Sequence, residues 1–497
     1  MYISERVNGK YCYACETVWD KGDKKYSTPG KCIGKLGPDG MLIPNRFLSQ
    51  LLYAESTDKP SLSDHERQII ETVVSKYGES VRDCAAKPPP KAISEDDYMT
   101  ARTVFMGPEL VFGDITKRYR IDTMLEKSFG EQIAKDIMSL AWYVASEGSA
   151  LSDSDVWLEV FENPRGHAMS SQDISKLLGI IDCDGMMTFY KLWLKEASRH
   201  ADKSDKVLYD LTSISYYGSG IDAVEYGYNR DSEPLPQVNY ALLCMRSTAM
   251  PLFAWTLNGS IMDMATLGTT LQFLRKLQYA PDCLMMDRGF GSMDNISGMF
   301  KNGHTFLQAV KVNANWVFDV IDASEAQRFI PDSKLEEGGQ TYYASTSDCR
   351  WVRTKSKAGK EKAIVHICNG SARDKYVNDK TIATAEDALK EYSIRDYIEK
   401  DFDEMKNCLD MKRIRVWSDL RMRSRLFIQF IAEIYMREIR VCMRKSNECK
   451  KLTRKQIFSN IKSIYRVKFK GKYNDVYPEL TKQQRHILEA LDVSYRG

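Results

Sequence analysis

The sequence predicts a multidomain α/β protein with a mixed-sheet core, a β-rich insertion in that core and a mainly helical region before it. Three observations support this fold class. The chain has 497 residues, which is too long for a single hydrophobic core. Strand-like and helix-like segments alternate between 206 and 312. Short β-like runs separated by Gly, Lys and Asp turns then fill 314–384.

The composition is that of an ordinary soluble globular protein, with 43% hydrophobic and 28% charged residues. The formal charge of +3 (71 Lys+Arg against 68 Asp+Glu) indicates no partner by itself. Between 442 and 472, however, eleven Lys/Arg face a single acid, Glu448. This segment, called the basic tract below, suits contact with a polyanion, although a solvated face would have the same pattern.

The cysteines and the apolar runs indicate the compartment. Twelve cysteines are scattered through the chain, and the only close pair, Cys12 and Cys15, has no second pair at zinc-site spacing. We therefore expect reduced thiols in a cytoplasm rather than a metal site. The first ten residues lack the apolar core of a secretory signal, and no apolar run approaches the roughly 18 residues of a membrane span.

The first 200 residues divide into a β/α part and a helical part. Residues 2–45 show strand-like alternation with Gly and Pro turns, 46–76 are helical in pattern, and the Pro-rich segment 87–91 marks a boundary. Residues 107–200 show repeated helical periodicity. A helix start at 171–173 fits the first half of a helix-turn-helix reader, and a plain helical bundle fits the same pattern.

The core follows in a recognisable order. Strand candidates at 207–215, 238–247 and 251–257 precede a helix at 264–277, a strand ending at Asp287, a helix near 295–301 and a strand at 306–312. Three antiparallel-type strands, then helix, strand, helix and strand, is the order of a ribonuclease-H-like core. Its first and fourth strands are neighbours, so Asp210 and Asp287 should approach one edge of the sheet.

A polar stripe is predicted on the helix after the insertion. Tyr392, Arg395, Glu399 and Lys406 lie at offsets of 0, 3, 7 and 14, which places them within about 60° of one another on a helix. A solvated helix face is the alternative for any charged helix. Here apolar positions would bury the other side of the helix: Ile394, Tyr397, Ile398, Phe402, Met405 and Leu409. A further long helix is expected at about 419–443.

Three carboxylates, Asp210, Asp287 and Glu399, are thus expected to converge. Hard oxygen donors without His or Cys favour Mg²⁺ or Mn²⁺ over zinc. Two such ions can activate an attacking water or 3′-hydroxyl and stabilise the leaving oxygen of a phosphodiester. Arg395 and Lys406 would contact the phosphates of the substrate. Either aspartate alone would be read as a turn or capping acid.

At this point the chain resembles the bacterial cut-and-paste DDE transposases of the insertion-sequence-four superfamily. Their Tyr-x2-Arg-x3-Glu-x6-Lys signature matches 392–406 at every interval. Their Asp-Arg-Gly-Phe block matches 287–290, and their Asp-x-Thr-Ser segment matches 210–213. Residues 227–231, followed by Gln237-Val238, resemble the family's turn into its second strand. The resemblance covers about 100–445.

The resemblance implies roles for individual residues. Asp210, Asp287 and Glu399 would be the metal-binding catalytic triad. Tyr392, Arg395 and Lys406, together with Arg288 of the second block, would contact DNA. The family also places a β-rich insertion before its glutamate. An aromatic residue near such a site can stack on a flipped base, and Trp316, Trp351 and Phe290 are candidates by location, with a core role as the alternative for each.

The resemblance also implies an activity and partners. The protein would bind the terminal inverted repeats of an insertion sequence, cut the strands with two divalent ions and join the 3′ ends to target DNA. It would act as a homodimer in a synaptic complex, in the bacterial cytoplasm at the nucleoid, with no membrane partner. Two alternatives are a catalytically silent DNA-binding derivative and a ribonuclease-H-like nuclease.

The expected domains are 1–95 (β/α), 96–203 (helical, DNA-binding), 204–313 (core, first part), 314–384 (β-rich insertion), 385–445 (core, second part) and 446–497 (basic).

Overall fold

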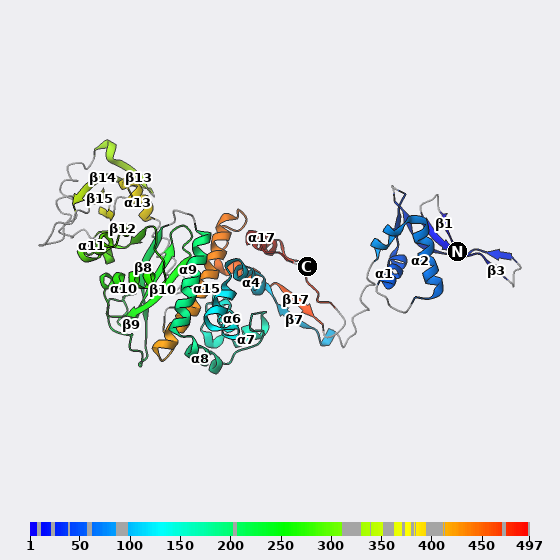
Figure 1. The fold of residues 1–497 in the computed structure, drawn as a ribbon, viewed down its shortest axis with the longest axis horizontal. Helices are drawn as coiled ribbons and strands as arrows, with labels where there is room; N and C mark the ends of the chain where they lie inside the picture. The colour runs from blue at the N-terminus through cyan, green and yellow to red at the C-terminus, as the bar shows by residue number, and fades with distance from the viewer. Residues whose placement is uncertain are drawn as a thin grey trace. The chain divides into compact units, whose positions relative to one another are not determined.

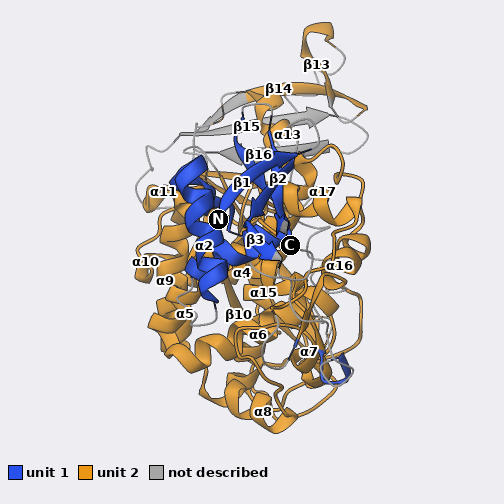
Figure 2. Cartoon of the chain, turned by 90° about the vertical axis from the view of Figure 1, so that its right-hand side faces the viewer, with its two compact units in different colours: residues 1–101, 469–473 blue, residues 102–468, 474–497 orange. Residues whose placement is uncertain are grey.

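The computed structural model forms two compact units, which are described separately (Figures 1 and 2). The first unit is Met1–Ala101 with Phe469–Tyr473, and the second is Arg102–Lys468 with Asn474–Gly497. The residues that the structure describes are 1–6, 11–20, 25–37, 40–56, 62–85, 98–201, 206–310, 330–337, 339–350, 362–369, 373–378, 382, 384–393, 411, 413–469 and 474–495.

The first unit is a small antiparallel sheet packed against helices. Its four-stranded sheet has the order β1-β2-β5-β6, and Ser63 and Glu66 form a capping box at the start of α2. Cys12 contacts the Tyr77 hydroxyl at 3.2 Å, whereas the Cys15 sulfur accepts from Arg6 at 3.3 Å. The two cysteines thus have separate partners. The elements are β1 (Tyr2–Arg6), β2 (Tyr11–Cys15), β3 (Val18–Asp20), β4 (Lys25–Ser27), β5 (Gly30–Leu36), β6 (Leu42–Pro44), α1 (Arg46–Ser56), α2 (Asp64–Tyr77) and η1 (Glu79–Cys84).

The second unit contains a bundle of helices around the long helix α15 (Asp419–Lys445), which the sequence predicted at about 419–443. Helices α6 and α8 both pack against α15. A capping box of Ser170 and Asp173 begins α8, at the predicted helix start. The other elements of this region are β7 (Arg102–Phe105), α4 (Gly107–Tyr119), α5 (Ile121–Phe129), α6 (Glu131–Glu147), η2 (Leu151–Asp153), α7 (Asp155–Val160), α8 (Ser171–Ile180), α9 (Cys183–His200), α16 (Arg454–Lys462), β17 (Tyr465–Lys468) and α17 (Lys482–Ala490).

The core sheet has the predicted ribonuclease-H-like order. Strands β10-β9-β8-β11-β12 are neighbours in that sequence, with β8 antiparallel to β9 and parallel to β11. The first and fourth strands of the core therefore lie side by side, as expected. The elements are β8 (Val207–Ser215), β9 (Gln237–Met245), β10 (Pro251–Asn258), α10 (Asp263–Lys276), β11 (Leu284–Met286), η3 (Arg288–Phe290), α11 (Met293–Lys301) and β12 (Phe306–Ala309).

The insertion is β-rich, as predicted, but its strands extend the core sheet instead of forming a separate one. Strand β16 pairs antiparallel with β12, and β15, β14 and β13 follow, so that the sheet has nine strands. The helix α13 then returns the chain to the core. The elements are η5 (Pro331–Ser333), β13 (Lys334–Glu337), β14 (Gln340–Arg350), β15 (Lys362–Asn369), β16 (Arg373–Asn378) and α13 (Ala385–Ser393).

The two faces of β8 meet different helices. The buried Tyr209 hydroxyl lies 3.0 and 2.9 Å from the Thr266 and Thr270 hydroxyls of α10. Ile214 lines a small buried gap with α15 residues such as Leu426. Since side chains alternate along a strand, Asp210 shares the face of Ile214.

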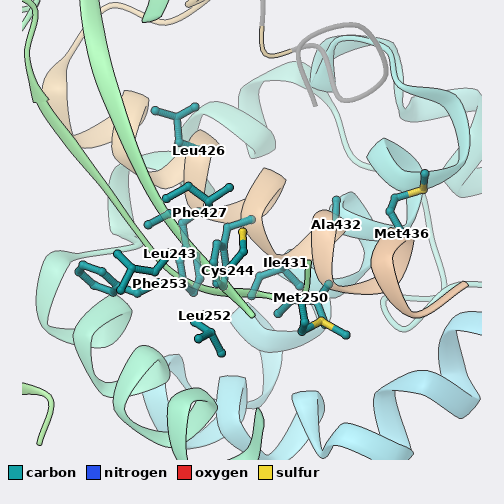
Figure 3. Close-up of a cluster of buried hydrophobic side chains, with 14 of the residues drawn as sticks. Leu243, Cys244, Met250, Leu252, Phe253, Leu426, Phe427, Ile431, Ala432 and Met436 are labelled. Atoms are coloured by element: carbon teal, nitrogen blue, oxygen red, sulfur yellow. The ribbon is translucent and has the colours of Figure 1, made fainter. Parts of the chain in front are cut away.

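Apolar packing holds α15 to the sheet. Figure 3 shows Leu243 and Phe253, from β9 and β10, in one cluster with Phe427 and Ile431 of α15. All four side chains are at most 2% exposed. Burying a side chain of this size stabilises the fold by about 1.5–3 kcal/mol.

Within the described residues, none of the helices is long and apolar enough to span a membrane.

Candidate active site

Asp210 and Asp287 occupy matching positions on neighbouring parallel strands. Tyr209 of β8 pairs in register with Met286 of β11; Asp210 is the next residue of β8, and Asp287 directly follows the end of β11. The backbone of Asp287 is still extended, at φ −73° and ψ 162°. In-register residues of parallel strands point to the same face, and neighbouring strands lie about 4.8 Å apart. The structure therefore brings these two predicted site residues together, and both side chains are half-buried.

Backbone groups hold both carboxylates. The Asp210 carboxylate accepts a hydrogen bond of 2.8 Å from the Leu211 N–H. The Asp287 carboxylate accepts one of 2.6 Å from the Arg288 N–H and caps η3. Asp287 thus does act as a local cap, the role that a single acid at a strand end suggests, while the strand register places it on the same face of the sheet as Asp210. The Arg288 side chain is exposed beside it.

Gln308 fixes the backbone under Asp287. Its side chain is fully buried on β12, and its amide donates hydrogen bonds to the Asp287 carbonyl and, at 3.0 Å, to the Ala309 carbonyl. Sequence reasoning missed this residue. The available signal was a single polar side chain inside the apolar strand Phe306–Ala309, because a buried amide in such a strand normally has hydrogen-bond partners.

Helix α13 is attached to the core by two consecutive residues. Glu391 pairs with Lys206 at 2.7 Å and with Arg246 at 2.8 Å, next to the start of β8 and the end of β9. The following residue, Tyr392, donates a hydrogen bond of 3.1 Å to the Asp287 carboxylate. One of the four predicted stripe residues thus lies at the carboxylate pair. Glu391 was not predicted, because its partners are distant in sequence.

Residues 227–231, which resemble the family's turn into its second strand, have a structural role through Arg230. Arg230 pairs with Asp263, the first residue of α10, and its guanidinium lies 3.3 Å from the Ser213 hydroxyl. Ser213 is an odd-numbered β8 position, on the face opposite Asp210. A Cβ at Gly289, in the Asp-Arg-Gly-Phe block, would lie 2.8 Å from the Asp263 carboxylate, so a glycine suits that close approach.

Several predicted residues cannot be placed. Arg395, Glu399, Lys406, Trp316 and Trp351 lie outside the described residues. Within the described residues, no group of three or more His, Cys, Asp or Glu could hold a metal ion.

Phe290, the third aromatic candidate for base stacking, is a core residue. It is 1% exposed, and its ring centroid lies 4.8 Å from that of Tyr209. Its side chain is therefore not available to a base in this structure.

The basic tract is partly neutralised inside the fold. Lys462 pairs with Glu147 at 2.8 Å, and Arg466 and Lys468 both pair with Glu162. The exposed cations of the described part of the tract are Arg444, Lys445, Lys450, Lys451 and Lys455. Its count of eleven therefore overstates the charge available to a polyanion.

Comparisons with known proteins add little to this geometry. No family model matches the chain, and no curated protein matches it. Among solved structures, it is similar to a piggyBac transposase in a cryo-EM structure of the synaptic complex with hairpin DNA. That similarity has a TM-score of 0.40 and 11% sequence identity, and it covers 72% of this chain and 78% of that chain. A likeness of this size supports no inference, so the resemblance to insertion-sequence-four transposases rests on the sequence motifs.

Proposed function

We propose that this protein is a DNA transposase of the DDE type, which cuts and joins DNA strands at the ends of an insertion sequence. The observation that carries the proposal is the placement of Asp210 and Asp287 directly after the register pair of Tyr209 and Met286. Two carboxylates on one face of neighbouring strands supply oxygen ligands of the kind that hold the divalent ions of phosphodiester chemistry. The match of residues 392–406 to the Tyr-x2-Arg-x3-Glu-x6-Lys signature favours a transposase over other enzymes that use such a carboxylate pair.

In this proposal the residues have separate tasks. Asp210, Asp287 and Glu399 would hold Mg²⁺ or Mn²⁺, and the oxygen-only donors of the two described aspartates fit these ions. The bound ions would supply an activated hydroxyl and stabilise the leaving oxygen. Tyr392 would orient the Asp287 carboxylate through its hydrogen bond. Arg288, Arg395 and Lys406 would bind phosphates of the transposon end.

The test is strand cleavage of a labelled duplex that carries the element's own end, in the presence of Mg²⁺. We expect cleavage at the element boundary by the wild-type protein, and its loss in Asp287→Asn and in Glu399→Gln with DNA binding retained. Asp282→Asn is the matched control, because Asp282 is an exposed acid in the loop before β11. Addition of EDTA should abolish cleavage, and restoring Mg²⁺ should recover it.

The alternatives give different results in the same assay. Tight end binding without cleavage by the wild-type protein would favour a silent DNA-binding derivative. Cleavage that shows no preference for the element's end, with no joining of 3′ ends to a target plasmid, would favour a nuclease. Sedimentation of the protein with end DNA would test whether two copies assemble on paired ends.

A further inference from the structure

A pocket with an arginine-rich lining lies in the second unit, away from the aspartate pair. It encloses about 290 Å³ between the turn at 150–152, the first turns of α8 and the segment that leads into α15. Three of its described lining residues are arginines, Arg415, Arg421 and Arg425, and none of its described lining residues carries a carboxylate. This pocket therefore suits an anion.

Backbone contacts hold two of these guanidinium groups in place. Arg425 is 5% exposed and donates a hydrogen bond of 2.7 Å to the Arg413 carbonyl. Arg421 donates one of 3.3 Å to the Ser175 carbonyl on α8. A planar guanidinium in a fixed position matches the geometry of phosphate oxygens. Ser171, the first residue of α8, also lines the pocket, and the start of that helix is capped by Ser170 and the Asp173 carboxylate.

An exposed indole lies beside the arginines. Trp417 also lines the pocket, and it is 73% exposed, although tryptophan is usually largely buried. Tyr217, two residues after the end of β8, is 71% exposed, and the Arg413 guanidinium, which pairs with Glu233 at 2.6 Å, lies 5.0 Å from its ring centroid. Exposed aromatic faces next to cations are the surface on which unpaired bases stack.

The two segments that carry these rings are held together. The Asp419 carboxylate, at the start of α15, accepts hydrogen bonds from the N–H groups of Asp222 and Ala223 at 3.0 and 3.2 Å. Ile414 donates to the Ser215 carbonyl at 3.1 Å. The aromatic residues are therefore presented by a fixed backbone, which lowers the entropy cost of binding.

We propose that this pocket binds one unpaired nucleotide of a DNA strand, with its phosphate at Arg415, Arg421 and Arg425 and its base against Trp417. Charge complementarity and the exposed indole together favour a nucleotide over a simple anion or an apolar partner. The inference concerns binding only, and it holds whether or not the protein cleaves DNA.

The experiment measures binding of a labelled single-stranded oligodeoxythymidine by fluorescence anisotropy, beside a duplex of equal length. Trp417→Ala should weaken single-strand binding roughly tenfold, the effect of losing one base stack, and should change duplex binding little. Arg421→Gln should also weaken it and lower the salt dependence by about one phosphate contact. Trp19→Ala is the matched control, because Trp19 is 46% exposed in the first unit, and it should have no effect.

Three results would overturn the proposal. Equal loss of single-strand and duplex binding in Trp417→Ala would mean that the indole does not read an unpaired base. Unchanged single-strand binding in Trp417→Ala, with the strand still displaced by inorganic phosphate but not by chloride at the same ionic strength, would mean that the pocket is an anion site only. A change of oligomeric state in Trp417→Ala without DNA, measured by sedimentation, would mean that the exposed indole belongs to a protein interface.

Discussion

The Tyr392 hydroxyl donates a hydrogen bond of 3.1 Å to the Asp287 carboxylate, across 105 residues of sequence. This bond joins the end of α13 to the end of β11. It also links two motifs that the sequence alone could connect only by resemblance, the Asp-Arg-Gly-Phe block and the start of the signature. A phenol at this position can hold the carboxylate in one rotamer.

Removing this hydroxyl should lower the rate of strand cleavage. In Tyr392→Phe the Asp287 carboxylate loses a donor, and a hydrogen bond to a charged group contributes about 1.5–3 kcal/mol. We expect a cleavage rate at least about tenfold lower, with affinity for end DNA changed much less. Single-turnover cleavage and a separate binding assay measure the two effects.

Tyr342→Phe is the matched control for this variant. Tyr342 donates a hydrogen bond of 3.0 Å to the Gln340 side chain on β14, so its replacement removes a comparable phenol bond outside the aspartate pair. Its cleavage rate should equal that of the wild-type protein. Equal rates for Tyr392→Phe and the wild-type protein would show that the bond to Asp287 does not matter for cleavage.

Gln308 should act as a positioning residue for Asp287. Gln308→Met removes the donors to the Asp287 and Ala309 carbonyls and should cost about 1–3 kcal/mol of unfolding free energy. It should also slow cleavage, because the backbone that presents Asp287 is no longer held. Gln484→Met is the comparison, since the buried Gln484 amide donates to Ser463 at 3.0 Å far from this sheet edge. A loss of stability in both variants, with slower cleavage only in Gln308→Met, is the expected pattern, and equal cleavage in both would exclude a positioning role.

The order of the core could be predicted from sequence because each strand is a short apolar run bounded by turn residues. Once that order is known, the adjacency of β8 and β11 follows, and with it the meeting of Asp210 and Asp287. This part depends on local pattern and on general sheet topology. The length of α15 was predictable for the same reason, since its apolar periodicity is continuous.

The contacts that complete the site could not be predicted from local sequence pattern. Glu391 pairs with Lys206 and Arg246, which are more than 140 residues away in sequence, and nothing local marks it. The pairing of β16 with β12 likewise joins residues that are distant in sequence, such as Leu307 and Asn378. The basic tract was overestimated because counting charges cannot reveal that Lys462 and Arg466 have internal acidic partners.

A buried ion pair on α15 provides a test of core energetics. Glu433 and Arg437 are paired one helical turn apart, and each side chain is 4% exposed. Removing one partner, as in Arg437→Met, leaves a buried charge and should cost about 3–5 kcal/mol. The double variant Glu433→Gln/Arg437→Met should be more stable than Arg437→Met alone, because it also removes the buried charge that Arg437 balanced. Urea unfolding of the variants measures this, and simple additivity of the two single effects would contradict it.

The stability of the second unit should depend on pH through Glu109 of α4. Burial raises the pKa of the Glu109 carboxyl above its ordinary value of 4.5, and the Glu162 charge acts in the same direction against smaller opposing effects of Lys117 and Arg466. The stability that its protonated form contributes is fully present below the ordinary value and is lost as pH rises through the raised pKa. Glu109→Gln should therefore melt at a higher temperature than the wild-type protein at neutral pH, and the difference should shrink on acidification.

Glu131→Gln should instead melt at a lower temperature than the wild-type protein at neutral pH, because the hydrogen bond from Lys135 lowers the pKa of Glu131. Melting curves of both variants and the wild-type protein, recorded from acidic to neutral pH, measure these differences. A difference in melting temperature for Glu109→Gln that does not change with pH would contradict the raised pKa of Glu109.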